Sequence, residues 1–226
     1  MAYGLEIYND GGFLQIADSV ANYYAIKSGS VIVPEVSSIG TAPNFGTSVT
    51  ISNDTPFDAI AVSSTDRYVI PKSVFASETY STNVVCTQSL TSGTLRYWLF
   101  RRYASTLPST SGYGMELYNE EGELRFSTNY PKLMRSHSTI PVTDVSSTVQ
   151  TYSLPTNRAF AFLAYGTSYT TMVAPTKASP DVKVPFSIQS FSGGVRSQRS
   201  NVRSGRVNST NPVYTGGMIA LDVTNY

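Results

Sequence analysis

The stretch YGLEIYNDGGFLQI at residues 3–16 decides the fold, because residues 113–126 repeat it as YGMELYNEEGELRF. The two stretches are identical at seven of fourteen positions, and most of the other changes are conservative. In each copy apolar and polar side chains alternate, which is the pattern of a β-strand with one buried face. Turn-forming residues follow, and then the apolar pattern resumes. Each stretch is therefore predicted to form a β-hairpin.

The predicted turns have the residues that tight hairpins use. Each copy has an asparagine that can start an Asx-type turn and, three residues later, a glycine suited to positive φ. Each copy also opens on Tyr-Gly, which is not turn chemistry, so convergence of two unrelated hairpins explains the similarity poorly. We assign a structural role in the hairpins to Gly4, Asn9, Gly12, Gly114, Asn119 and Gly122.

The composition favours strands and turns over helices, because 12% of the residues are aromatic, only 14% are charged, and 16 Gly and 12 Pro are present. Strand-like runs separated by turn residues follow each hairpin. In the first half they are residues 48–53, 58–64, 67–76, 82–90 and 94–103. In the second half they are residues 138–145, 149–155, 158–165, 169–175, 182–191 and 217–226.

The polar, turn-rich segment ASTLPSTSG (104–112) is predicted to be a linker between the two halves. We expect an all-β protein of two tandem small antiparallel β-sandwich modules, 1–103 and 113–226, related by internal duplication. The alternative is one continuous sandwich or barrel whose halves share a core. The repeat alone does not separate these two architectures.

The formal net charge of +1 provides no overall attraction to nucleic acid or to an anionic membrane. No apolar run approaches the roughly 18 residues of a membrane helix, and the sequence does not begin with a secretory signal pattern. We therefore expect a soluble protein with no nucleic-acid partner and no membrane insertion. Cys86 is the only cysteine, which excludes a disulfide within one chain and fits synthesis in a reducing compartment.

Side chains that could perform chemistry are sparse. His137 is the only histidine, so a His-rich metal site within one chain is excluded and only this residue could act as the base of a catalytic triad. Its surroundings, MRSHST, are typical of a solvated strand edge. Cys86 lies in the apolar run NVVCTQSL, which favours a small core residue over a reactive thiolate.

The acidic residues do not form a recognisable catalytic or metal-binding pattern. A glycosidase needs two acids across the sugar bond, but Glu6 and Glu116 are equivalent positions of the repeat and are predicted to face outward. The segment DTPFDAIAVSSTD contains Asp54, Asp58 and Asp66 without the regular order of a calcium loop, so a weak calcium site is only the alternative here. We predict no enzymatic activity, no catalytic residue, no bound metal and no cofactor.

One segment, GGVRSQRSNVRSGRVN (193–208), is strongly basic and has no acid between its arginines. Its Gly, Ser and Asn content predicts a long flexible loop. Such a loop could bind phosphate, an acidic glycan or the acidic face of a neighbouring subunit, or serve only to keep a hairpin tip soluble. No aromatic residues are interleaved with it, so a protein partner is favoured over nucleic acid. The candidate binding residues are Arg196, Arg199, Arg203 and Arg206.

The repeated stretch resembles the opening of small proteins encoded among the tail genes of tailed bacteriophages. In those proteins a Gly-hydrophobic-x-hydrophobic-x-Asn-x-x-Gly-x-hydrophobic-x-Phe phrase opens a β-rich module. The YWLF run at 97–100, followed by SGYG at 111–114, is also similar. The first copy departs from the phrase at Gly11, Phe13 and Ile16. The second copy matches it best, at Gly114, Met115, Leu117, Asn119, Gly122, Leu124, Phe126 and Ser127.

This resemblance implies a non-enzymatic structural component of a phage virion, a minor tail or tail-tip protein that docks onto other tail proteins. It implies assembly in the host cytoplasm and incorporation into the tail, as a homo-oligomer that we expect to be a trimer or hexamer. The alternative is a receptor- or glycan-binding module of the adsorption apparatus, which would hold the bacterial surface through tyrosine faces and the basic segment. A polysaccharide-degrading enzyme is the least favoured interpretation.

Overall fold

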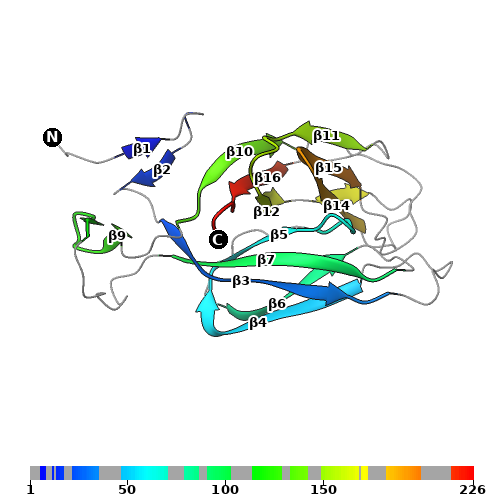
Figure 1. Cartoon of the computed structure of the whole chain (residues 1–226), viewed down its shortest axis with the longest axis horizontal. Coiled ribbons are helices and arrows are strands. Elements are labelled where there is room, and N and C mark those ends of the chain that lie inside the picture. The colour runs from blue at the N-terminus through cyan, green and yellow to red at the C-terminus, as the bar shows by residue number, and fades with distance from the viewer. Residues whose placement is uncertain are drawn as a thin grey trace.

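The computed structural model (Figure 1) shows an all-β protein built from antiparallel strands, as the sequence predicts. No helix occurs in the part of the chain that the structure describes. None of its elements is therefore a helix that could span a membrane. The structure describes residues 6–8, 12, 14–17, 22–35, 47–70, 79–86, 91–102, 114–128, 133–141, 149–167, 169–172, 182–199 and 215–226.

The largest sheet has six strands and contains strands from both halves of the chain. The halves meet where β5 pairs with β12, and Val62 and Phe162 are the paired residues at this seam. Across the sheet the order is β10 (Ser136–Pro141), β16 (Thr215–Asp222), β12 (Phe160–Thr167), β5 (Ala59–Ser63), β7 (Gly93–Arg102) and β3 (Tyr23–Val33).

A second layer of strands packs against one face of this sheet. Its first-half strands are β4 (Thr47–Phe57) and β6 (Thr79–Cys86). Its second-half strands are, in spatial order, β11 (Gln150–Ser153), β15 (Gly194–Arg199), β14 (Val182–Phe191) and β13 (Tyr169–Met172). Val69 joins the two groups, because it forms bridges with Cys86 of β6 and with Ile188 of β14. The backbone N–H groups of Val69 and Ile188 each donate to the other's carbonyl, at 2.7 and 2.8 Å.

The strand order on one side of the seam mirrors the order on the other. In each half the strands are counted from the one that follows the hairpin. The first strand (β3, β10) lies at an edge of the large sheet, the last (β7, β16) lies next to it, and the third (β5, β12) lies at the seam. In the second layer the second strand of each half (β4, β11) pairs with the strand that precedes the last (β6, β15). Both halves therefore arrange their strands in the same way about the seam.

Each half has a core between the two layers. Because side chains alternate along a strand, one set from each strand of the large sheet faces the second layer. The first-half core comprises Val33, Val49, Ile51, Phe57, Ile60, Val62, Val69, Val84, Cys86, Leu95 and Leu99. The second-half core comprises Ile140, Leu154, Phe162, Ile188, Val195, Met218 and Ala220.

A third cluster lies on the opposite face of the large sheet and belongs to both halves. Small residues alternate with large ones in the two seam strands, AIAV at 59–62 and AFAF at 159–162. The cluster comprises Ala59, Ala61, Trp98, Phe100, Ala161, Leu163, Leu221 and Val223. The halves therefore share a sheet and a core cluster, which matches the alternative of one sandwich with a shared core. The linker predicted at 104–112 lies outside the described residues.

In the first half, two strand assignments differ from the sequence prediction. β3 was not predicted, because its centre, KSGS at 27–30, is polar and hides the alternation that ends in buried Val33. The ring of Tyr97 on the neighbouring β7 lies against the open side of Gly29. The strand predicted at 67–76 is reduced to the bridges of Val69, with buried Arg67 two residues before it. Residues 71–76 are outside the described part.

Candidate docking surface

Both predicted hairpins are present and have the same geometry. The first pairs β1 (Glu6–Tyr8) with β2 (Leu14–Ala17), and the second pairs β8 (Glu116–Tyr118) with β9 (Leu124–Ser127). Every residue pair of the first hairpin recurs in the second at positions 110 higher. In both, the register shifts between the second and third residues of the first strand. The sequence repeat is therefore also a structural repeat.

The turn glycines have positive φ, 75° at Gly12 and 77° at Gly122. A Cβ atom added at either position would meet no heavy atom within 4 Å. The requirement for glycine therefore comes from the backbone conformation and not from crowding. Gly114 is exposed just before β8. Gly4 and Asn9 lie outside the described residues.

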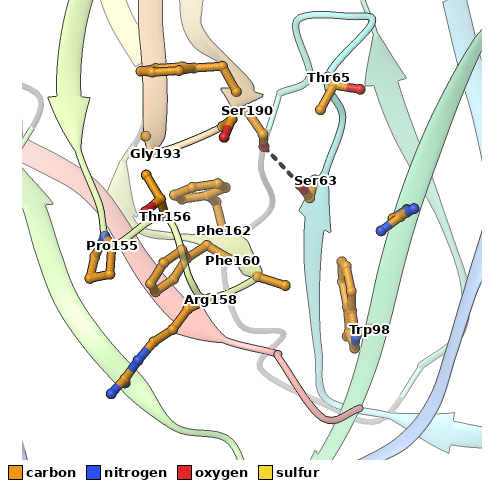
Figure 2. A pocket seen from close by; sticks show the side chains of 15 residues that line it. Ser63, Thr65, Trp98, Pro155, Thr156, Arg158, Phe160, Phe162, Ser190 and Gly193 are labelled. Atoms are coloured by element: carbon orange, nitrogen blue, oxygen red, sulfur yellow. Dashed lines mark hydrogen bonds between the residues drawn. The ribbon is translucent and has the colours of Figure 1, made fainter.

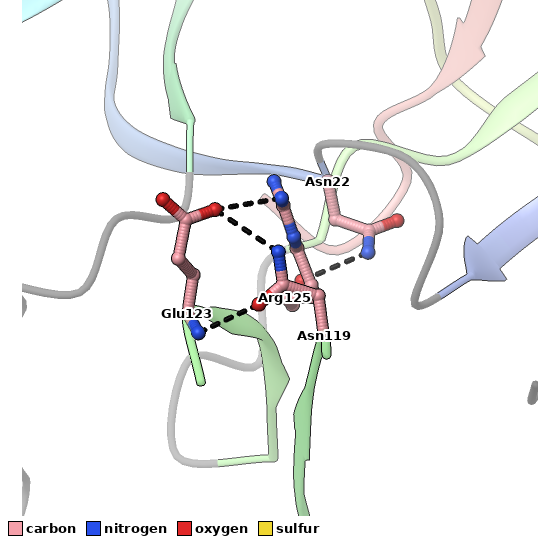
Figure 3. Close-up of polar contacts among 4 residues, drawn as sticks. All are labelled: Asn22, Asn119, Glu123 and Arg125. Carbon is pink, nitrogen blue, oxygen red and sulfur yellow. Dashed lines mark hydrogen bonds and ion pairs between the residues drawn. The ribbon is translucent and has the colours of Figure 1, made fainter. Parts of the chain in front are cut away.

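In the second hairpin Asn119 organises the turn, as Figure 3 shows. Its side-chain oxygen accepts the backbone N–H of Glu123 at 2.7 Å, and its Nδ2 donates to Glu123 Oε2 at 3.1 Å. Arg125 forms an ion pair with the same carboxylate at 2.7 Å. The side chain of Asn22, the residue before β3, donates to the carbonyl of Arg125 at 2.8 Å. These bonds fix the turn and attach the hairpin to the large sheet.

Replacing Gly122 tests how much the turn contributes to stability. We expect Gly122→Val to lower the free energy of unfolding by about 1–2 kcal/mol, since a branched side chain is disfavoured at positive φ. Gly122→Asn is the matched control and should retain most of the stability, because asparagine tolerates this conformation. Urea unfolding followed by circular dichroism measures both variants. Equal losses for Val and Asn would contradict the conformational explanation.

Each hairpin fixes one tyrosine with a neighbouring glutamate. The hydroxyl of Tyr8 donates to Glu6 Oε2 at 2.7 Å, and the hydroxyl of Tyr118 donates to Glu116 Oε2 at 2.5 Å. The hydrogen bond that Tyr8 donates to Glu6 raises the pKa of Tyr8, and the one that Tyr118 donates to Glu116 raises the pKa of Tyr118. Both hydroxyls therefore remain protonated in neutral solution, and both rings are held in place.

The hairpins expose apolar side chains on or beside their first strands. Of seven exposed large apolar residues in the described part of the chain, four lie on or beside the first strand of a hairpin. These four, which we call the hairpin surface, are Ile7, Tyr8, Met115 and Tyr118, with exposed fractions of 37, 52, 48 and 50%. Sequence reasoning identified the hairpins but not this exposure, which depends on the side each hairpin turns toward the body.

The inward faces of the hairpins share one small core. It comprises Ile16, Tyr24, Leu124, Phe126 and Leu133, so residues of both hairpins pack together against β3. In Figure 1, β1, β2 and β9 lie at the same end of the molecule, away from β11, β14 and β15. The hairpin surface is therefore presented at one end of the sandwich.

The prediction of a flexible basic loop is wrong for its first two arginines. Arg196 and Arg199 lie in β15, which pairs with β14, and Arg196 also pairs with Thr151 of β11. Arg196 is exposed and lies 5.0 Å from the ring centroid of Phe191, a cation–π distance. Val195 and Ser197 are buried on either side of Arg196, and because Ser197 is polar this alternation is hidden in the sequence. Arg203 and Arg206 lie outside the described residues.

His137 and Cys86 occupy structural positions. His137 is half-buried in the edge strand β10, and its ring centroid lies 4.9 Å from that of Phe160. Cys86 is fully buried in the first-half core, and burial raises the pKa of its thiol to about 11. The thiol is therefore protonated at neutral pH and is not a nucleophile.

Two of the aspartates considered for calcium hold strand ends. Asp58 accepts the backbone N–H of Arg102 at 2.8 Å, and Asp66 accepts that of Thr94 at 3.0 Å, at opposite ends of β7. Asp54 is exposed on β4. Within the described ranges, no three His, Cys, Asp or Glu side chains gather as metal ligands would.

Comparisons with protein-family models, curated proteins and solved structures found no match for this chain.

Proposed function

We propose that this chain is a non-enzymatic structural component of a bacteriophage tail, at or near the tail tip, and that the hairpin surface docks onto neighbouring tail proteins. The supporting observation is the repeated hairpin. It recurs with the same register, the same positive-φ glycine and the same Tyr–Glu hydrogen bond. The mirrored strand order about the seam supports an origin by duplication of one β-module.

The chemistry of the hairpin surface suits protein association. Tyrosine combines a large apolar ring with a hydroxyl and is enriched at protein interfaces. The rings of Tyr8 and Tyr118 are already held by Glu6 and Glu116, so binding has less side-chain freedom to remove. Two equivalent hairpins allow one chain to contact two neighbours, as in a ring of trimeric or hexameric symmetry.

A double variant tests this proposal. In particles assembled with Tyr8→Ser/Tyr118→Ser, we expect incorporation of the protein to fall roughly tenfold or more, because aromatic anchors supply much of the affinity of interfaces. Unfolding of the free protein should change little, since both rings are half-exposed. Quantitative immunoblotting of purified particles gives the incorporated amount.

Tyr80→Ser is the matched control, because Tyr80 is an exposed tyrosine (58%) on β6, away from the hairpins. It should leave incorporation unchanged. Gold-labelled antibody, viewed by electron microscopy, should mark the distal tail. Label on the capsid, or normal incorporation of the double variant, would contradict the proposal.

A further inference from the structure

A pocket of about 310 Å³ lies where the two halves of the large sheet meet (Figure 2). β5 and β12 pair at Val62 and Phe162 and then diverge, because β5 ends at Ser63 while β12 begins at Phe160. The pocket opens at this divergence. The first half contributes Ser63, Thr65, Arg96 and Trp98, and the second half contributes the turns around Thr156 and Gly193 together with Phe160 and Phe162.

Hydrogen bonds between the halves hold the pocket open. The hydroxyls of Ser63 and Ser190 lie 2.8 Å apart, as the dashed line in Figure 2 shows. The backbone N–H of Ser190 donates to the carbonyl of Ser64 at 2.8 Å, and Gln189 Nε2 donates to the carbonyl of Thr65 at 2.7 Å. The site is therefore formed before a ligand arrives, which reduces the entropy lost on binding.

The pocket wall combines aromatic rings, hydroxyls and cations. Phe160 and Trp98 supply apolar surface, fully buried Phe162 lies behind the wall, and Ser63, Thr65 and Thr156 supply hydroxyls. The charged lining residues are Arg96 and Arg158, and no carboxylate belongs to the lining. The wall is thus rich in hydrogen-bond donors and carries positive charge.

Two of these donors have no acceptor within the described part of the protein. Arg158 is paired with Asp222 at 3.0 Å, whereas Arg96 is exposed and has no ion pair with a described residue. Trp98 is 8% exposed, and its indole N–H has no hydrogen-bond partner. The indole N–H is itself buried, so a ligand meets the ring of Trp98, and Arg96 is the donor that a ligand oxygen can reach.

We propose that this pocket binds an acidic sugar unit, a hexuronic acid residue of a polysaccharide. Its volume lies at the lower end of the range for small-ligand sites and is large for inorganic phosphate alone. The aromatic rings pack against the apolar face of a pyranose, and the hydroxyls bond its hydroxyl groups. Arg96 pairs with the sugar carboxylate. This inference does not depend on the docking function, because no residue of the hairpin surface lines the pocket.

Trp98 provides the measurement, since it is the only tryptophan in the chain. Titration with methyl glucuronide should change its fluorescence saturably, and methyl glucoside should bind at least tenfold more weakly. Arg96→Gln should weaken binding of the glucuronide about tenfold and leave that of the glucoside unchanged. Lys27→Gln, at an exposed lysine of β3 outside the pocket, is the matched control and should bind as the unchanged protein does.

Several results would overturn the proposal. They are the absence of any fluorescence change or heat of binding with the glucuronide at millimolar concentration, equal binding of inorganic phosphate, and equal binding of the glucoside. An equal loss from Arg96→Gln and Lys27→Gln would show general charge attraction and would also overturn it. Failure here would leave incorporation into particles unaffected, and failure of the docking proposal would leave sugar binding unaffected.

Discussion

Phe162→Ala is expected to lower the free energy of unfolding by about 3–5 kcal/mol and to destabilise both halves of the chain together. Phe162 is fully buried in the second-half core, and its backbone pairs with Val62 across the seam. Removing its ring leaves a cavity beside the strands that join the halves. Because the large sheet and the third cluster cross the seam, we expect one cooperative transition.

The single tryptophan allows unfolding of the first half to be followed separately. Trp98 belongs to the first half, whereas the substitution lies in the second. Urea unfolding followed by Trp98 fluorescence should shift to lower denaturant by the same amount as unfolding followed by far-UV circular dichroism. Phe57→Ala, at a fully buried phenylalanine of β4, is the matched control in the first half and should shift both signals as well.

Independent halves would give a different result. Phe162→Ala would then leave the Trp98 transition unchanged while circular dichroism resolved a second, earlier transition. That result would support the description as two separate sandwich modules at 1–103 and 113–226.

The second large effect is expected from Arg67→Ala, which should cost about 3 kcal/mol of stability. Arg67 is only 2% exposed. Its Nη2 donates to the carbonyl of Thr91 and, at 3.4 Å, to that of Pro34, and its side chain lies against Gly93. Alanine would leave these carbonyls without their donor and open a cavity beside the first-half core.

Two further variants separate these causes. Arg67→Lys keeps the charge but not the planar fork of donors, so it should recover only part of the loss. Arg96→Ala, at an exposed arginine of β7, should change stability by no more than about 0.5 kcal/mol. Thermal and urea unfolding provide the values. A loss below about 1 kcal/mol for Arg67→Ala would show that the buried guanidinium is not a structural anchor.

Sites that depend on neighbouring residues could be predicted from the sequence, whereas sites formed by distant segments could not. Cys86 was recognised as a core residue because its neighbours in the sequence are apolar, and it is buried. Arg196 was assigned to a loop because the Gly, Ser and Arg around it dominate the local composition. Its place in a strand depends on two partners: β14, which directly precedes it, and β11, whose paired residue Thr151 lies 45 positions (196 − 151) earlier in the sequence. The seam pocket was missed for the same reason, because its walls come from two separate parts of the chain, within 63–98 and within 155–194.

The sequence by itself determined the local elements of this protein. The hairpins follow from alternating side chains and from residues such as Gly122, whose positive φ is a property of one residue and its neighbours. Only the tertiary structure decided that β5 pairs with β12, that Arg67 is buried and that Tyr8 and Tyr118 are exposed. Backbone hydrogen-bonding groups are the same at almost every residue, so they do not specify which strand pairs with which. That choice is made by the packing of whole faces, which brings together residues from both halves of the chain.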